Sequence, residues 1–240
     1  MNRDRPAPTG LVLDFDGVIA DGTNRAYIDA YLEAIRATGL RLPQTLLEAR
    51  ILQHWGASPR MELAGALVEA PDQVDAALDH YQRHIVQHLR AAARPIEGVL
   101  EAVATLAQRY RLYVISGMGQ VALDGVVRDF GLEGAFQRVV STSGSDEPWR
   151  QKRSGYHLRQ LLAEAALRPH QVLCVGDAES DIAMARSCGV EPVAVLSGNL
   201  SREAAQRLGV AWILPSLVAL PGFLDRVRFS RLPADTRTGQ

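Results

Sequence analysis

The chain alternates short apolar runs with segments of helical periodicity, and this alternation constrains its fold more than any other feature. From about residue 97 to residue 227 each apolar run spans four or five residues. Strands that alternate with helices favour a parallel, doubly wound sheet, because only a helical crossover brings successive strands into the same direction. We therefore predict an α/β fold with strands at residues 11–15, 112–116, 138–141, 172–176, 193–196 and 211–214.

Residues 22–94 differ in character, because helical patterns fill the whole segment. Gly39 is a candidate helix C-cap, and Pro59 is expected at a first helical position after Ser58 as the N-cap. A further helix is expected over about residues 72–89. This segment predicts an all-helical cap domain inserted after the first strand. The predicted division is a core of residues 10–21 and 95–228, a cap of residues 22–94, and tails of residues 1–9 and 229–240.

Polar side chains occur where three of the predicted strands end. Asp14 and Asp16 follow the first apolar run, Ser116 ends the second, and Asp177 follows the run over 172–176. The carboxyl ends of parallel strands meet at one edge of the sheet, where open α/β sheets bind ligands. Two neighbouring carboxylates after a buried strand are costly unless a cation or hydrogen bonds compensate them. We therefore predict a cation-dependent reaction site at this edge.

Lys152 joins this site on different grounds, because it is the only lysine among the 26 basic residues. A genome that favours arginine codons accounts for the general bias. The one position that keeps lysine then indicates a need for a compact ammonium group rather than a planar guanidinium. Asp181, one helical turn after Asp177, completes the predicted set.

These residue types supply what phosphoryl transfer requires, namely a nucleophile, charge neutralisation and a proton carrier. Asp14 is the candidate nucleophile, and Asp16 can protonate the leaving oxygen and then deprotonate the attacking water. Asp14 and Asp177 would bind a hard divalent cation such as Mg²⁺, with the backbone carbonyl of Asp16 as a further ligand. Asp181 would bind the metal directly or through water, or would orient Lys152.

The charges of the predicted site also indicate a metal. Four carboxylates in one pocket repel each other, and Mg²⁺ together with Lys152 returns about three positive charges. Protonation of Asp16 removes the remaining negative charge and leaves this residue in the form that a general acid needs. Ser116 can donate a hydrogen bond to a phosphoryl oxygen, and Gly117 lets backbone amides approach that oxygen.

These motifs and their order resemble the haloacid dehalogenase-like hydrolase superfamily over nearly the whole chain. The matching segments are Asp14-Phe15-Asp16-Gly17-Val18 for motif I, Ser116-Gly117 for motif II, Lys152 for motif III, and Gly176-Asp177 with Asp181 for motif IV. The resemblance implies a Rossmann-like core with a C1-type cap, Mg²⁺ dependence and an aspartyl-phosphate intermediate. Within the superfamily the chain looks most similar to phosphoglycolate phosphatases and β-phosphoglucomutases. It departs from the family pattern where Arg153 instead of proline follows Lys152, and in the acidic then aromatic segment 146–149.

Two features of the predicted cap have open or ordinary interpretations. Residues 54–60 form either a substrate-specificity loop, in which the similar family loop makes Gly56 and Arg60 the candidates, or an ordinary turn with Trp55 in the cap core. The histidines at residues 80, 84 and 88 have a spacing compatible with zinc binding. No further ligand lies near them in the sequence, so we interpret them as a helix face.

We expect a Mg²⁺-dependent hydrolase of small phosphomonoesters. A sugar-phosphate mutase would use the same intermediate, but mutase relatives often carry threonine where Gly22 follows Asp21 here. Imine-forming phosphonate hydrolysis is disfavoured because the predicted cap contains no lysine. A catalytically silent binding or regulatory protein on the same fold is an alternative of another class, which the complete motif set opposes. The substrate stays open among a sugar phosphate, phosphoglycolate, a nucleotide and a pathway-specific intermediate.

The composition argues against several classes of partner. A net charge of −1 argues against broad binding to nucleic acid or to an anionic membrane. No stretch approaches the roughly 18 apolar residues of a membrane span, and residues 1–10 lack the apolar run of a secretion signal. We therefore expect a cytoplasmic monomer or homodimer whose partner is a small-molecule phosphate ester, with no nucleic acid and no membrane.

Overall fold

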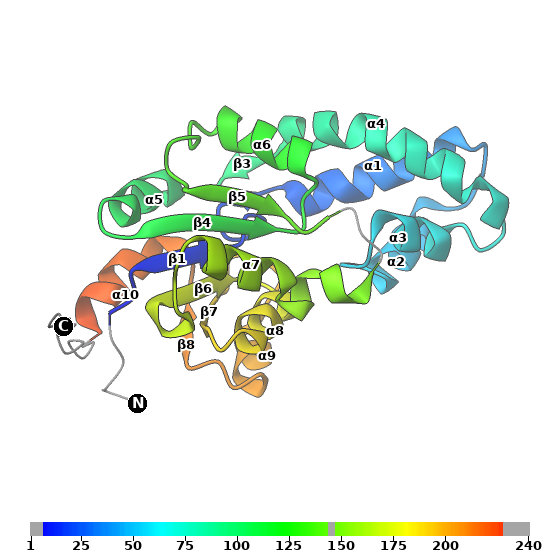
Figure 1. Ribbon diagram of the computed structural model, residues 1–240. Coiled ribbons are helices and arrows are strands. Elements are labelled where there is room, and N and C mark those ends of the chain that lie inside the picture. Colours follow the sequence, from blue (N-terminus) through cyan, green and yellow to red (C-terminus); the bar gives the residue numbers. More distant parts are fainter. Residues whose placement is uncertain (1–6, 144–146, 228–240) are drawn as a thin grey trace, which may run out of the picture.

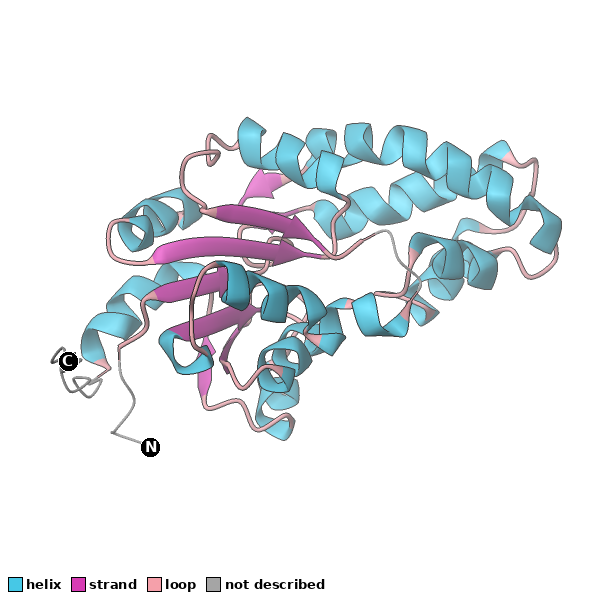
Figure 2. Cartoon of the chain, viewed as in Figure 1, coloured by secondary structure: helices cyan, strands magenta, loops and turns pink. Residues whose placement is uncertain are grey.

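Six parallel strands form the central sheet, in the order β5-β4-β1-β6-β7-β8 (Figure 1). The computed structural model describes residues 7–143 and 147–227. Helices lie on both sides of the sheet (Figure 2), which confirms the predicted α/β fold with a doubly wound parallel core. The strands are β1 (Gly10–Leu13), β4 (Arg111–Ser116), β5 (Arg138–Ser141), β6 (Val172–Gly176), β7 (Glu191–Val195) and β8 (Trp212–Leu214).

The first strand ends at Leu13, two residues earlier than predicted. The chain turns here because the amides of Ile19 and Ala20 donate to the carbonyl of Phe15, at 2.8 and 2.9 Å. The Phe15 side chain is fully buried and stacks on Phe130, with ring centroids 5.9 Å apart. Phe15 therefore anchors the turn after β1 instead of extending the sheet.

Alternate residues of β1 enter two hydrophobic clusters, because successive side chains of a strand point to opposite faces. Leu11 and Leu13 pack with α5, α6 and α10, whereas Val12 packs with α7 and α8. Ala194 of β7 joins a smaller cluster with α9. These helices are α5 (Val99–Ala107), α6 (Gln120–Asp129), α7 (Tyr156–Glu164), α8 (Glu179–Ser187), α9 (Arg202–Arg207) and α10 (Leu220–Arg226), and the 3₁₀ turns of the core are η2 (Pro148–Arg150), η3 (Lys152–Ser154), η4 (Pro169–Gln171) and η5 (Leu217–Ala219).

Four helices between β2 and β3 confirm the predicted helical cap. Their buried residues, among them Ile35, Leu63 and Tyr81, form a separate hydrophobic cluster. The long helices α1 and α4 run side by side (Figure 1), and the Ser58 hydroxyl caps α3 by accepting from the Met61 amide at 3.4 Å. The elements are β2 (Ala20–Asp21), α1 (Thr23–Ala37), α2 (Gln44–Gln53), α3 (Pro59–Ala66), η1 (Pro71–Gln73), α4 (Val74–Ala92) and β3 (Arg94–Pro95).

The exact limits of core and cap stay a prediction. The antiparallel pairing of β2 with β3 marks where the chain enters and leaves the cap, and it supports a division at residues 21–22 and 94–95. Residues 1–6 and 228–240, which include most of the predicted tails, lie outside the described residues. Within the described ranges, no helix combines the length and the apolar character needed to cross a membrane.

Gly22 lies where the chain enters the cap, and its replacement tests how closely the two crossings pack. Its φ is +82°, and an added Cβ would lie 2.5 Å from the carbonyl oxygen of Ala92, at the end of α4. Gly39 has a similar φ of +89° but nothing within 4 Å of an added Cβ. We expect Gly39→Ala to lower the free energy of unfolding by about 1 kcal/mol through backbone strain, and Gly22→Ala by roughly 3 kcal/mol because a steric clash is added.

Urea unfolding of the two variants and the wild type measures this difference. Equal losses of stability would contradict the close packing of Gly22 against Ala92.

Candidate active site

The turn after β1 positions the first carboxylate. The amide of Asp14 donates to the carbonyl of Val175 in β6 at 2.9 Å, so the main chain here continues the sheet pairing. The Oδ1 atom of Asp14 accepts from the Phe15 amide at 2.8 Å. Gly17, with φ +69°, passes so close to Asp177 that an added Cβ would lie 2.4 Å from its Oδ2 atom. Glycine at this position is therefore what allows the turn to approach the end of β6.

The end of β4 brings Ser116 to Asp16, although the two residues are 100 positions apart in the sequence. Ser116 is fully buried, and its Oγ donates to Oδ2 of Asp16 at 3.3 Å and accepts from the Met118 amide at 3.1 Å. The other oxygen of Asp16, Oδ1, is fully buried. Burial raises the pKa of this carboxyl group, and a hydrogen bond from the Thr23 side chain lowers it and partly offsets the effect of burial. Gly117 is exposed, and an added Cβ there would meet nothing within 4 Å. The backbone after Ser116 thus faces open space beside the carboxylates.

Lys152 lies at the start of η3 and joins two carboxylates. Its Nζ lies 2.7 Å from Oδ1 of Asp14 and 2.7 Å from Oδ1 of Asp181, and the side chain is 11% exposed. Burial alone would lower the pKa of Lys152, but the attraction of Asp14 and Asp181 outweighs burial and raises it above its usual value. The only lysine of the chain is therefore a protonated ammonium group at the centre of the predicted site.

The end of β6 and the first turn of α8 supply two more buried carboxylates, Asp177 and Asp181. The amide of Ala178 donates to Oδ2 of Asp181 at 3.0 Å, which satisfies a free amide at the start of α8. An added Cβ on Gly176 would lie 2.2 Å from the Cβ of Asp181. Only glycine at residue 176 lets Asp181 fold back towards the end of the strand.

The four carboxylates carry more negative charge than Lys152 can balance. Burial raises the pKa of Asp14 to about 7, and it raises the pKa values of Asp177 and Asp181 to about 6. Each of these three also has a neighbouring aspartate that raises its pKa further, while Lys152 lowers it. Burial likewise raises the pKa of Asp16. The site therefore favours either a bound cation or partial protonation.

The donor set fits a hard divalent cation. Carboxylate oxygens of Asp14, Asp177 and Asp181 lie within 4.8 Å of one another. Oxygen-only ligands of this kind suit Mg²⁺, which takes carboxylates and water. Asp16, also predicted in the metal site, is not one of these three, because its carboxylate contacts Ser116. A contribution of Asp16 would come from its backbone carbonyl, as the sequence predicts.

Asn199 holds Asp177 in place, although no sequence motif pointed to it. The backbone amide and Nδ2 of Asn199 donate to Oδ2 of Asp177, at 2.7 and 3.0 Å. Its Oδ1 accepts from Nδ2 of Asn24 in α1 at 2.9 Å, which connects the cap with the core. An added Cβ on Gly198 would lie 2.0 Å from Oδ2 of Asp177. Asn199 follows β7 at the same edge of the sheet. A search for polar residues after every predicted strand, including the one at residues 193–196, would therefore have identified it.

Tyr27 links the cap to the aspartates. Burial raises the pKa of Tyr27 well above its usual value, and the negative charges of Asp16 and Asp14 raise it further. The Tyr27 ring meets the ring of Trp55 edge to face, with centroids 6.2 Å apart. Trp55, in the turn between α2 and α3, therefore contacts Tyr27, whose pKa depends on the charges of Asp14 and Asp16.

A buried glutamate holds that turn in place. Glu62 is 4% exposed, and its Oε1 accepts from the amide of Gly56 at 2.8 Å. Burial raises the pKa of Glu62 to about 7, although hydrogen bonds from Tyr31 and the Gly56 amide lower it. Arg60, the other predicted specificity residue, pairs with Asp75 of α4. The role of Gly56 and Arg60 towards a substrate stays a prediction.

The sequence matches a known family over most of its length. Residues 8–189 match the model described as haloacid dehalogenase-like hydrolase. Phosphoglycolate phosphatases of Mesorhizobium japonicum and Rhodospirillum rubrum are each 26% identical to the chain. The first alignment covers 82% of this chain and 86% of the relative, and the second covers 90% and 91%. Pyrophosphatase PpaX of Halalkalibacterium halodurans is 24% identical over 65% of this chain and 71% of its own.

Solved structures share the fold. A haloacid dehalogenase-like family protein of Streptococcus pneumoniae superposes with a TM-score of 0.72 at 16% identity, covering 93% of this chain and 99% of its own. A hydrolase of the same superfamily, subfamily IA, from Geobacter sulfurreducens gives 0.68 at 24% identity, covering 92% and 98%. At these identities the likeness establishes the architecture of sheet and cap.

Replacing Glu62 tests how much free energy of unfolding is lost when this buried carboxyl group ionises. Glu62→Gln keeps an acceptor oxygen for the Gly56 amide and removes the titrating group. The pKa of Glu62 is about 7 in the folded protein and 4.5 in the unfolded chain. The wild type therefore loses stability as the pH rises from 4.5 to about 7, because Glu62 must ionise while it is buried. We therefore expect the Tm of Glu62→Gln to exceed that of the wild type by roughly 5 °C at pH 8, with a gap that closes towards pH 4.5.

Thermal unfolding monitored by circular dichroism across this pH range measures the gap. Glu97→Gln makes the same change at an exposed position and is the matched control. A difference that does not change with pH would contradict the titration of Glu62.

Proposed function

The chain belongs to the haloacid dehalogenase-like hydrolase family, and from this premise we propose that it hydrolyses small phosphomonoesters with Mg²⁺ through an aspartyl-phosphate intermediate. Family membership agrees with the resemblance of the four motifs and makes the protein an enzyme of the hydrolase class. The names of its phosphatase relatives support the choice of a phosphate ester as substrate.

The observation that carries the proposal is the convergence of the motif residues at one edge of the sheet. Lys152 lies 2.7 Å from Asp14 and from Asp181, and Ser116 donates to Asp16. Each residue alone has an ordinary structural explanation. Together they supply a nucleophile, a proton carrier and groups that hold a phosphoryl oxygen, all beside the open backbone at Gly117.

Asp14 is assigned the nucleophilic attack. Its contacts with the Phe15 amide and Lys152 are both on Oδ1, so we assign the attack on phosphorus to Oδ2. The bond between phosphorus and the ester oxygen breaks as the bond to Asp14 forms. Lys152 and Ser116 donate to the phosphoryl oxygens and stabilise the charge that develops on them.

Asp16 is assigned the proton transfers. In the first half-reaction it gives its proton to the leaving ester oxygen, which releases the alcohol. In the second half-reaction it takes a proton from a water molecule that attacks phosphorus, which releases inorganic phosphate and restores the Asp14 carboxylate. Before the ester binds, the hydrogen bond from Ser116 orients this carboxyl group. The Ser116 hydroxyl has only one proton to donate, so it turns from Asp16 to the phosphoryl oxygen when the substrate is present.

Asp14, Asp177 and Asp181 would hold Mg²⁺, directly or through water. When bound, the ion supplies positive charge that offsets the carboxylates and the phosphate. Asn199 orients Asp177 towards this position through two hydrogen bonds.

Phosphate release from a panel of two phosphomonoesters and one phosphoanhydride tests the proposal. The panel holds 2-phosphoglycolate, pyrophosphate and glucose 1-phosphate, each assayed with Mg²⁺ and with EDTA, and the sugar is also assayed for an isomerised product. We expect Mg²⁺-dependent release from one or a few of these compounds, no release with EDTA, and a loss of at least about 10⁴-fold in kcat for Asp14→Asn. Asp72→Asn, at an exposed position of the cap, is the matched control and should keep full activity.

Two results would overturn the proposal. An isomerised sugar phosphate without net phosphate release would identify a mutase. No turnover of any ester by folded protein in Mg²⁺ would favour the silent binding protein.

The role of Asn199 gives a separate prediction. Asn199→Ala removes the Nδ2 contact with Asp177 but keeps the backbone one, so we expect the Mg²⁺ concentration for half-maximal activity to rise about tenfold. Asn24→Ala breaks only the contact between the cap and Asn199, and it should leave this concentration within about twofold. Titration of activity with Mg²⁺ measures both values, and equal effects of the two variants would contradict a direct role of Asn199.

A further inference from the structure

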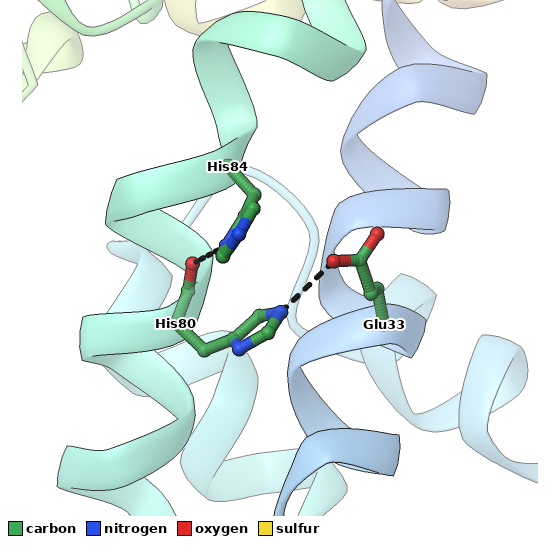
Figure 3. Close-up of side chains that lie close together, drawn as sticks. All are labelled: Glu33, His80 and His84. Atoms are coloured by element: carbon green, nitrogen blue, oxygen red, sulfur yellow. Dashed lines mark hydrogen bonds and ion pairs between the residues drawn. The ribbon is translucent and has the colours of Figure 1, made fainter.

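Three histidines of α4 lie around one glutamate of α1, between the two long helices of the cap. His80 and His88 place their Nε2 atoms 2.9 and 2.8 Å from Oε1 and Oε2 of Glu33. The ring of His84 stacks on that of His80, with centroids 4.1 Å apart. Figure 3 shows Glu33 and the two stacked histidines facing one another across the two helices. The structure thus supplies a ligand from α1 that the spacing of the histidines alone did not offer.

The tautomer of His84 leaves one of its ring nitrogens available. Its Nδ1 lies 2.8 Å from the backbone carbonyl oxygen of His80. A carbonyl oxygen only accepts hydrogen bonds, so Nδ1 carries the proton, and Nε2 of the neutral ring has a free lone pair. Histidines that bind metals in proteins are oriented in this way, by donating the other ring N–H to a carbonyl or carboxylate.

The donor atoms are close enough for one ion. Glu33, His80 and His84 each offer a ligand atom, and these atoms lie within 4.8 Å of one another. Two imidazoles and one carboxylate form a donor set typical of zinc with a fourth position for water. The side chains of His80 and Glu33 are 22% and 45% exposed, so both the ion and that water have access from solvent.

We propose that Glu33, His80 and His84 form a binding site for Zn²⁺ or a similar borderline divalent ion, distinct from the aspartate site. The nitrogen donors separate the two sites chemically, because Mg²⁺ prefers oxygen ligands only. Binding of the ion replaces the hydrogen bond between Nε2 of His80 and Oε1 of Glu33. His88 is the positioning residue, because it holds the second oxygen of Glu33.

The ion would connect the two long cap helices. α1 begins at Thr23, directly after the chain enters the cap, and α4 ends at Ala92, directly before it leaves. A bond from Glu33 through the metal to His80 and His84 would join the last part of α1 to the middle of α4. The ion therefore stabilises the cap, and this effect does not depend on the reaction proposed for the aspartates.

Competition with a chromophoric Zn²⁺ chelator tests the site on the full chain after treatment with EDTA. Excess Mg²⁺ in the assay occupies the aspartate site. We expect one Zn²⁺ per chain in the wild type, at least about tenfold weaker binding in Glu33→Gln and His84→Ala, and a similar loss in His80→Ala. His88→Ala should keep the stoichiometry with about tenfold weaker binding, since it removes only the orienting contact.

Two controls separate this site from other sources of binding. His170→Ala changes a histidine of the core outside the cluster, and Asp177→Asn changes the aspartate site; both should bind Zn²⁺ as the wild type does. Co²⁺ should give the intense visible absorption of a four-coordinate ion in the wild type and lose it in His84→Ala. Circular dichroism checks the fold of each variant.

The proposal is overturned if the wild type binds no Zn²⁺ beyond the level of His84→Ala, which would leave the cluster as a set of ion pairs. It is also overturned if Asp177→Asn abolishes the binding, which would assign the ion to the aspartates.

Discussion

One buried ammonium group holds the end of the sheet together. Lys152 lies between Asp14, which follows β1, and Asp181, in the first turn of α8, and the two carboxylates would repel each other without it. Removing one partner of such a buried pair leaves an uncompensated charge, which costs several kcal/mol, about 3–5 in typical cases. The position of η3, the turn after β1 and the start of α8 therefore depend on the same two contacts.

Glycines set how closely these loops approach one another. Gly17 and Gly198 both pass so near Asp177 that any side chain would displace it, and Gly176 does the same for Asp181. Backbone therefore confines Asp177 and Asp181, in addition to the side-chain contacts of Asn199 and Lys152. Confinement of this kind keeps like charges together at a cost in stability, which is typical of a site that is organised before its ligand arrives.

The sequence predicted the parts of this structure that follow from local patterns. Apolar runs gave the strands, and polar residues at their ends gave Asp14, Ser116 and Asp177 at one edge, because parallel strands share a direction. The end of β1 was wrong by two residues, because the aromatic Phe15 lengthens the apolar run while its buried ring anchors a turn. Periodicity does not distinguish a buried strand residue from a buried turn residue.

Contacts between distant helices were beyond such patterns. Glu33 lies 47 residues from His80, and their meeting depends on how α1 packs on α4, which only the tertiary structure shows. The same holds for Asn24 and Asn199, which are 175 residues apart and join the cap to the core. The packing of two helices is set by many small side-chain contacts, so no single sequence motif predicts it.

The burial of Lys152 also determines how the protein responds to reagents that modify amines. The chain has no other lysine, and this one is protonated, paired with two carboxylates and largely shielded from solvent. Acylating reagents attack an amine only in its neutral, accessible form, so the folded protein offers them no reactive side-chain amine. Modification at Lys152 then requires the loops around it to open, and its rate reports how often they do so.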